Sequence, residues 1–252
     1  MKKVVIKLIV TLASIAFFLT IEPVWATGTT HIWAPSTDIQ AFRVWHITCD
    51  IYLPFQNDAA GNRVPTVTNI GLTVGILPFK KLNAEIGFDH KSGLGIVDNY
   101  PLYINFKLGI PENTYGKLFP AVAAGILDIG TKRNWTDFNV IYGKMAKSLK
   151  IDRTFLGRFS FGYFTGNERL LLDDKGNKDN SGIMTAWERT ISEISDRLWI
   201  SVDYMGTKSA YGSLNFGVSW KFAPNVALIG GYELYNNNIL ADTFTMQVDI
   251  DI

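Results

Sequence analysis

The stretch Leu-Asn-Ala-Glu-Ile-Gly-Phe-Asp at residues 82–89 indicates the fold class most directly. Leu82, Ala84, Ile86 and Phe88 fall on one parity, and polar or small residues fall on the other. Successive side chains of a β-strand point to opposite faces, so a repeat of two residues predicts a strand with one apolar and one polar face.

The same alternation recurs along the rest of the chain and predicts about twelve strands. They are expected near residues 40–52, 66–76, 82–89, 101–110, 119–129, 138–147, 157–165, 182–190, 197–205, 212–220, 226–235 and 243–252. Val122, Ile126 and Ile141 break the parity of the fifth and sixth strands, so ten or fourteen strands remain possible.

The connections between these strands alternate between two kinds. Compact connections are expected at residues 77–81, 111–118, 148–156, 191–196 and 221–225. Longer and more polar connections are expected at residues 53–65, 90–100, 130–137, 166–181 and 236–241. This order is typical of an antiparallel up-and-down barrel with short turns at one end and long loops at the other. The barrel is expected to form a single domain over residues 40–252.

The N-terminus has the composition of a cleavable signal peptide at residues 1–26. The charged residues Lys2 and Lys3 precede an apolar run at residues 8–19, and Val-Trp-Ala at 24–26 ends on a small residue. An uncleaved anchor helix needs about 20 apolar residues, and Lys7 shortens the run. Residues 27–39 are expected to be an irregular segment that precedes the barrel.

Composition excludes several classes of protein. The signal peptide holds three of the 24 Lys and Arg and one of the 23 Asp and Glu, which leaves 21 basic and 22 acidic side chains. This balance has no basic footprint for nucleic acid. Cys49 is the single cysteine, so the exported chain cannot form an internal disulfide. Beyond the signal peptide, no apolar run is long enough for a membrane-spanning helix.

Alternation alone does not reveal which face points outward, because a soluble sandwich or lipocalin-type barrel also alternates. The polar parity is rich in Gly, Ser, Thr and Asn, which suits a crowded lumen, and large apolar residues such as Phe159, Phe161 and Trp220 recur from strand to strand. The pattern therefore favours a transmembrane barrel whose apolar parity faces lipid. A secreted soluble β protein is the alternative.

The chain resembles the bacterial outer-membrane β-barrel family in the broad sense, through its signal peptide, its alternating connections and its closing strand. That strand reads Phe244-x-Met246-x-Val248-x-Ile250-x-Ile252. The resemblance covers nearly all of the exported chain and is architectural, with no specific porin or transporter matched. It implies a place in the bacterial outer membrane, with membrane lipid and the barrel-assembly machinery as partners. The chain departs from the family pattern by ending on Ile252 rather than an aromatic residue.

The histidines and acidic loops predict no catalytic residue, metal site or cofactor. His31 is expected in a mobile lead-in, and His46 lies on the polar parity, where it is expected to form hydrogen bonds in the lumen. Asp89 and His90 are adjacent, so they should point to opposite faces and cannot form the acid–histidine pair of a barrel protease. The acidic loop at 173–180 lacks the spacing of a calcium-binding loop.

The polar parity is expected to line the lumen, where function would reside. Its predicted members include Asp50, Asn83, Glu85, Asp89, Asn105, Lys107, Arg158, Ser160, Asp203, Asn215, Glu233, Gln247, Asp249 and Asp251. Acids outnumber bases in this set, and charged linings bias ion passage, so the sequence predicts a narrow passive channel for small polar solutes with weak cation preference.

A plugged barrel is the equally weighted alternative, because twelve strands leave only a modest bore. Lys107 and Arg158 would then pair with Glu85 or Asp203 and fill the lumen. In that case the role would be structural, or would depend on binding of a surface partner by the long loops at 53–65 and 166–181.

Overall fold

The computed structural model describes residues 29–57, 61–152 and 154–252. The strands within these ranges are β1 (Trp45–Pro54), β2 (Val67–Gly75), β3 (Asn83–Ser92), β4 (Leu102–Ile110), β5 (Ala121–Gly130), β6 (Val140–Ile151), β7 (Thr154–Thr165), β8 (Ser181–Thr190), β9 (Leu198–Met205), β10 (Ser213–Ala223), β11 (Val226–Tyr235) and β12 (Thr243–Asp251). A short 3-10 helix, η1 (Gly95–Asn99), lies between β3 and β4.

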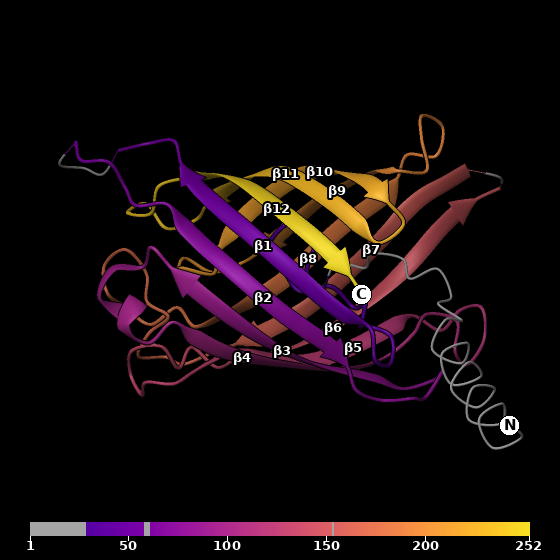
Figure 1. Cartoon of the computed structure of the whole chain (residues 1–252), viewed down its shortest axis with the longest axis horizontal. Coiled ribbons are helices and arrows are strands. Elements are labelled where there is room, and N and C mark those ends of the chain that lie inside the picture. The colour runs from indigo at the N-terminus through magenta and orange to yellow at the C-terminus, as the bar shows by residue number, and fades with distance from the viewer. Residues whose placement is uncertain (1–28, 58–60, 153) are drawn as a thin grey trace, which may run out of the picture.

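These strands form one closed antiparallel barrel (Figure 1). Each strand pairs with the next along the chain, and β1 pairs with β12 from His46 opposite Asp251 to Pro54 opposite Thr243. The predicted all-β fold and the predicted count of about twelve strands are therefore confirmed, with the ends of the strands shifted by a few residues. Among the described residues, no helix is long and apolar enough to cross a membrane.

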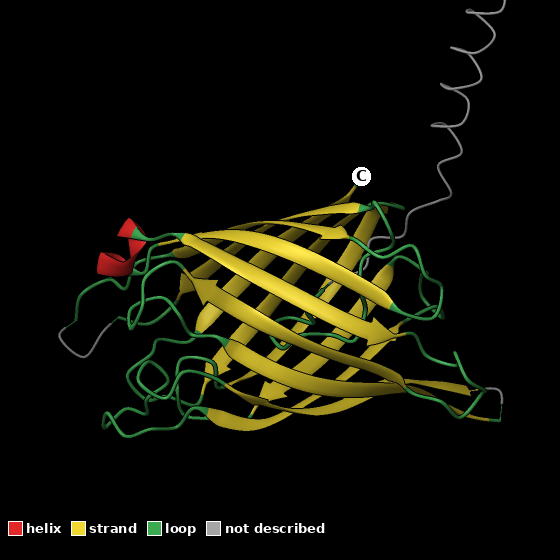
Figure 2. Ribbon diagram, turned by 90° about the horizontal axis from the view of Figure 1, so that it is seen from below, coloured by secondary structure: helices red, strands yellow, loops and turns green. Residues whose placement is uncertain are grey.

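The two ends of the barrel differ in their connections. The longer ones, among them the described parts of 55–66 (residues 55–57 and 61–66) and residues 166–180, extend from the same end as η1, whereas the C-terminus lies at the opposite end (Figure 2). At this opposite end β6 and β7 are separated by residues 152–153, and β10 and β11 by residues 224–225. The long-loop end is the outer end in a barrel of this topology, and the short-turn end faces the periplasm.

The apolar parity points out of the barrel and the polar parity points in. Phe106, Phe161 and Phe216 are 38%, 55% and 40% exposed, whereas Ser160 is 8% exposed and Asn215 is fully buried. A soluble β protein would place these phenylalanines in its core. An apolar outer face on a closed antiparallel barrel is the arrangement of a bacterial outer-membrane protein, as the sequence predicted.

A β-bulge explains the broken parity of the fifth strand. Ile126 and Ile129 of β5 pair with Phe106 and Ile104 of β4, so β5 carries one extra residue between these two pairs. Asp128 lies in the bulge with a positive φ of 54° and is buried. A bulge re-aims side chains, and here it directs Asp128 into the lumen.

The outward orientation predicts that the lipid-facing side of β7 does not tolerate charge. Phe161→Lys should lower the free energy of unfolding in lipid vesicles by about 2 to 4 kcal/mol, because a charged side chain near the bilayer midplane loses its hydration. Urea unfolding of the vesicle-embedded protein measures this loss. Phe161→Leu is the matched control and should cost much less; an equal cost for both variants would contradict lipid exposure.

Candidate functional site

Residues 29–40 lie inside the lumen and are called the plug below. Thr30 and Pro35 form an isolated β-bridge, so the plug is a tight hairpin with Trp33 near its tip. His31 is 2% exposed and Ala34 is fully buried. The expectation that His31 belongs to a mobile lead-in is therefore wrong, because the barrel wall encloses it. Residues 1–28, which include the predicted signal peptide, lie outside the described residues.

Asp203 of β9 holds the tip of the plug. Its carboxylate accepts backbone hydrogen bonds from Ile32 (N···O 2.8 Å), Trp33 (3.3 Å) and Ala34 (2.9 Å). It also accepts a hydrogen bond of 2.8 Å from the side-chain amide of Asn215. Buried backbone donors require an acceptor, and a single carboxylate supplies it for three consecutive residues.

Lysines on the barrel wall bind plug carbonyl groups. Lys107 Nζ donates to the carbonyl oxygens of Thr29 at 2.9 Å and Asp38 at 2.7 Å, and it forms an ion pair with Glu85 at 2.9 Å. Lys144 Nζ donates to the carbonyl oxygen of Pro35 at 2.8 Å. The predicted pairing of Lys107 with Glu85 is thus present, with the plug as a further partner.

Arg158 has a different partner from the one predicted. Its guanidinium binds the Asp38 carboxylate through Nη1 at 2.7 and 2.8 Å, and Nη2 donates to Thr37 Oγ1 at 2.6 Å. Pairing with Glu85 or Asp203 was expected because the plug was not foreseen as a source of acid. Gln247 is a further anchor, because its Nε2 donates to the Ile32 carbonyl oxygen at 2.7 Å, and Glu85 accepts a hydrogen bond of 2.7 Å from the Gln40 amide.

Glycines on the lumenal face make room for the plug. A Cβ atom on Gly217 would lie 2.6 Å from Ile32 Cδ1, and one on Gly231 would lie 3.3 Å from Ile32 Cγ2. Close approach of this kind requires a residue without a side chain. Some of the glycines on the polar parity are therefore explained by the space that the plug occupies.

His31 and His46 are both buried, but their surroundings differ in charge. Burial, together with Lys144, Arg158 and Lys107 nearby, holds the pKa of His31 well below its usual value, so the ring is neutral at pH 7. His46 lies between Asp251, at 2.7 Å from Nδ1, and Asp249, at 3.3 Å from Nε2. This contact joins β1 to β12 at the point where the barrel closes.

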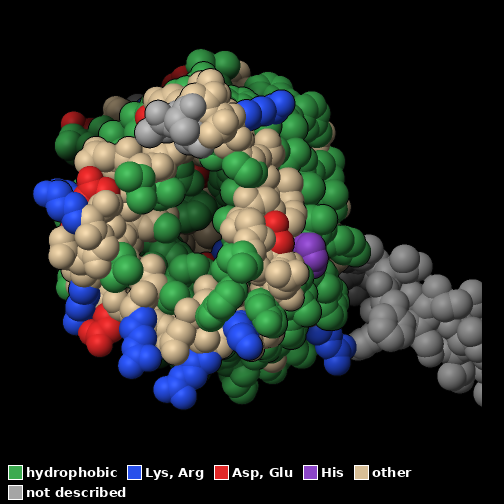
Figure 3. All heavy atoms as spheres, turned by 90° about the vertical axis from the view of Figure 1, so that its left-hand side faces the viewer, with side chains coloured by type: hydrophobic (Ala, Val, Ile, Leu, Met, Phe, Trp, Pro, Cys, Tyr) green, Lys and Arg blue, Asp and Glu red, His purple; other side chains and the backbone are tan. Residues whose placement is uncertain are grey.

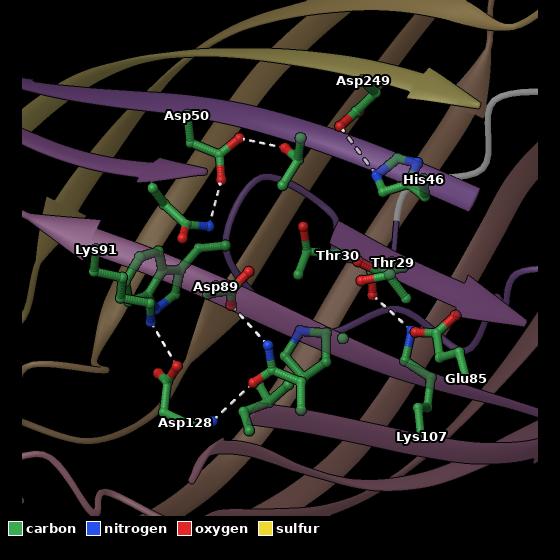
Figure 4. Close-up of a pocket in the computed structure, with 18 of the residues that line it drawn as sticks. Thr29, Thr30, His46, Asp50, Glu85, Asp89, Lys91, Lys107, Asp128 and Asp249 are labelled. Atoms are coloured by element: carbon green, nitrogen blue, oxygen red, sulfur yellow. Dashed lines mark hydrogen bonds and ion pairs between the residues drawn. The ribbon is translucent and has the colours of Figure 1, made fainter. Parts of the chain in front are cut away.

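Between the plug and a wall made mainly by β1–β5, with Met205 of β9 and Asp249 of β12, lies a cavity of about 120 Å³, called the acidic cavity. The carboxylates of Asp50, Glu85, Asp89, Asp128 and Asp249 line it, as the close-up in Figure 4 shows. Some of these acids are paired with cations and others bond neutral side chains, a difference that matters for ion passage.

The pairing within the acidic cavity is uneven. Asp128 forms an ion pair with Lys91 at 2.6 Å. Asp50 accepts hydrogen bonds from Thr48 at 2.6 Å and Asn69 at 3.1 Å, and Asp89 accepts one from Asn105 at 2.7 Å. The charges of Asp50 and Asp89 are thus less compensated than the charge of Asp128.

The predicted lumenal residues fall into three groups. The residues that contact the plug, directly or through one partner, are Glu85, Lys107, Arg158, Asp203, Asn215 and Gln247. Those that line the acidic cavity are Asp50, Glu85, Asp89, Asn105, Lys107 and Asp249. The remaining positions are Asn83, which lines a cavity at the periplasmic end, and the buried residues Ser160, Glu233 and Asp251. Their part in solute passage remains a prediction.

The prediction omitted Asp128 and Lys144. The bulge in β5 reverses the parity at Asp128, and no local signal marks it. In β6 the odd-numbered residues, such as Ile141 and Met145, point outward, and Lys144 is even-numbered and buried. Applying this parity to the whole strand would have placed Lys144 in the lumen.

Solved structures resemble the barrel in overall fold. A COG4313 outer membrane channel from Pseudomonas putida F1 is 10% identical with a TM-score of 0.46, covering 85% of this chain and 97% of its own. The NanC porin is 10% identical with a TM-score of 0.45, covering 82% and 98%. The outer membrane protein Omp33 of Acinetobacter baumannii is 10% identical with a TM-score of 0.42, covering 83% and 98%. No protein-family model and no curated protein matches the chain.

Loss of the Asp203 carboxylate should release the plug. Asp203→Ala leaves the buried amides of Ile32 and Ala34 and the partly buried amide of Trp33 without their acceptor, at a cost of about 1 to 3 kcal/mol for each buried unsatisfied group. Larger single-channel conductance steps in planar bilayers and faster proteolysis of residues 29–40 are expected. Ser201→Ala is the matched control on β9, since the Ser201 hydroxyl bonds the Trp187 carbonyl oxygen in the wall. Unchanged conductance and proteolysis in Asp203→Ala would contradict the assigned role.

Proposed function

We propose that this protein is a narrow, cation-preferring passive channel of the outer membrane, through which small polar solutes pass beside the plug. A series of adjoining cavities that reaches from the outer loops to the short-turn end is the observation that carries the proposal. Closed barrels of this architecture serve as channels when the lumen holds a continuous aqueous path.

The outermost of these cavities, called the outer vestibule, has a volume of about 250 Å³ and is bordered by the outer-loop residues Val64, Leu94 and Leu240. It shares Trp33 and Lys91 with the acidic cavity. The mouth is visible as a hollow when the barrel is viewed from the long-loop end (Figure 3).

The acidic cavity adjoins a third cavity, called the inner cavity, of about 180 Å³. Both are lined by Thr30 of the plug and Asp249 of β12. The inner cavity extends to Lys221, near the short turn between β10 and β11.

The charge along this route favours cations. Glu85 is paired with Lys107 and Asp128 with Lys91, whereas Asp50 and Asp89 form hydrogen bonds with neutral side chains and Asp89 shares Lys91 with Asp128 only through a longer-range attraction. Rings of acidic side chains bias a pore toward cations. The acidic cavity should therefore concentrate cations and repel anions.

The plug also favours a second candidate function, a sealed barrel that acts through its outer loops. In that case the wild-type protein should give no conductance step, whereas Asp203→Ala, with the plug released, should conduct. Deletions within loops 55–66 and 166–180 should abolish binding of a surface partner. A conducting wild-type protein decides in favour of the channel.

Neutralising the two less compensated acids should reduce cation preference. The double variant Asp50→Asn, Asp89→Asn keeps the shape of the cavity and removes its two less compensated charges, so the reversal potential in a KCl gradient should move toward zero. Planar-bilayer recording of the refolded protein measures this change. Asp173→Asn in the exposed outer loop is the matched control. The double variant retaining the wild-type reversal potential would contradict the assignment of selectivity.

A further inference from the structure

Six of the 18 residues that line the outer vestibule are aromatic, and most of the others are apolar. The aromatic residues that line it are Trp33, Tyr52, Tyr103, Phe138, Tyr211 and Tyr235. They come from the plug, from several strands and from outer connections, and the hollow mouth in Figure 3 shows hydrophobic side chains around its interior. An apolar concave site with few polar groups is typical of small-molecule binding.

The rings contact one another around Trp33. The Trp33 ring lies edge-on to Tyr52 at 5.7 Å and to Tyr235 at 6.4 Å between ring centroids, and it lies 6.1 Å from Tyr211. Phe138 contacts Tyr211 at 5.8 Å, which extends the aromatic surface across the cavity. These mutual contacts hold the rings in place before any ligand arrives.

Acidic side chains lie next to the aromatic rings, on the side of the acidic cavity. Asp128 lines the vestibule, and Asp50 and Asp89 line the adjoining acidic cavity. Lys91 also lines both cavities and is paired with Asp128 at 2.6 Å, so the negative charge available to a ligand comes from Asp50 and Asp89. The side of the vestibule that adjoins the acidic cavity therefore suits a positively charged group.

Two buried polar atoms at this site have no hydrogen-bond partner among the described residues. They are Tyr103 Oη, on a side chain that is 1% exposed, and Asn69 Oδ1. Both residues line the vestibule. Buried polar atoms are normally satisfied, and the Asn69 oxygen is an acceptor, which suits an N–H donor on a ligand.

We propose that the outer vestibule binds small organic cations that carry an aromatic or apolar group, the class represented by arylalkylammonium ions. The ring of such a ligand lies among Trp33, Tyr52 and Tyr211, and its ammonium group points toward Asn69 and the carboxylates of Asp50 and Asp89. Cations are attracted to the faces of aromatic rings, and the apolar body gains from leaving water. The proposal deepens the proposed channel function, on which it rests, by naming the class of solute.

Binding can be tested on the refolded full-length mature protein by titration calorimetry with four matched probes. Phenethylamine carries both the ring and the charge and should bind. Phenethyl alcohol lacks the charge and butylamine lacks the ring, so each should bind about tenfold more weakly or worse. Phenylacetate carries the opposite charge and should not bind. Equal affinity for phenethylamine and phenethyl alcohol would overturn the proposal.

A pair of tyrosine variants separates the vestibule from nonspecific partitioning into detergent. Tyr52→Leu removes a vestibule ring and should weaken phenethylamine binding about tenfold. Tyr163→Leu removes a ring from the lipid-facing surface, where Tyr163 is exposed, and should leave binding unchanged. Circular dichroism and the heat-dependent shift in gel mobility verify that both variants fold. The same loss of binding in both variants, or in neither, would overturn the vestibule as the site.

Conductance measured in the same preparation distinguishes the proposed channel function from the proposed binding site in the vestibule. Cation-selective conductance without phenethylamine binding overturns the vestibule site and leaves the channel function intact. Phenethylamine that binds at the vestibule of a protein without conductance supports the site and overturns the channel. Phenethylamine added from the outer side should also block the potassium current in the wild-type protein, and this block should weaken in Tyr52→Leu.

Discussion

Hydrocarbon provides no hydrogen-bond partner for a peptide group, and every other feature of this structure follows from that constraint. An open sheet would leave two strand edges unsatisfied in lipid, at several kcal/mol for each exposed backbone group, so the sheet must close. The pairing of β1 with β12 achieves this closure, and the His46 contacts with Asp249 and Asp251 reinforce it on the lumenal side. Closure then assigns the apolar parity to lipid and collects the polar parity in the interior.

The crowded interior creates a second problem, because buried charges need partners. The plug and the wall satisfy each other: Lys107 and Lys144 donate to carbonyl groups of the plug, while Asp203 accepts from its backbone amides. Buried ionic groups are costly when one partner is lost. The same contacts therefore fix the plug to strands on several sides of the lumen, and the acidic cavity lies beside it.

Local sequence patterns were sufficient to predict the barrel. The strand containing residues 82–89 and its equivalents carry their orientation in two-residue alternation, which needs no knowledge of distant contacts. The bulge at Asp128 was not predictable in this way, because one inserted residue shifts the parity without a compositional mark. Lumenal Glu85, Asp89 and Asn105 were located by parity alone, although their functional role is a separate question.

The position of residues 29–40 inside the lumen was the main feature that the sequence analysis did not predict, because its plugged alternative filled the lumen with the side chains of Lys107, Arg158 and their acidic partners. Residues 29–40 show no periodicity, and their anchors lie far away in the sequence: Ile32 and Asp203 are separated by 171 positions. Short-range reasoning cannot detect such contacts. The abundance of Gly on the polar parity predicted a crowded lumen. Gly217 and Gly231 lie against Ile32 of the plug, which fills part of that lumen.

Hydrogen–deuterium exchange of the vesicle-embedded protein tests the central claim, that residues 29–40 are folded inside the barrel, most directly. The amides of Ile32 and Ala34 are buried and bonded to Asp203, so they should exchange slowly, on the timescale of amides in the barrel strands. Exchange of these amides as rapid as that of the outer loops, while the strands remain protected, would contradict the account.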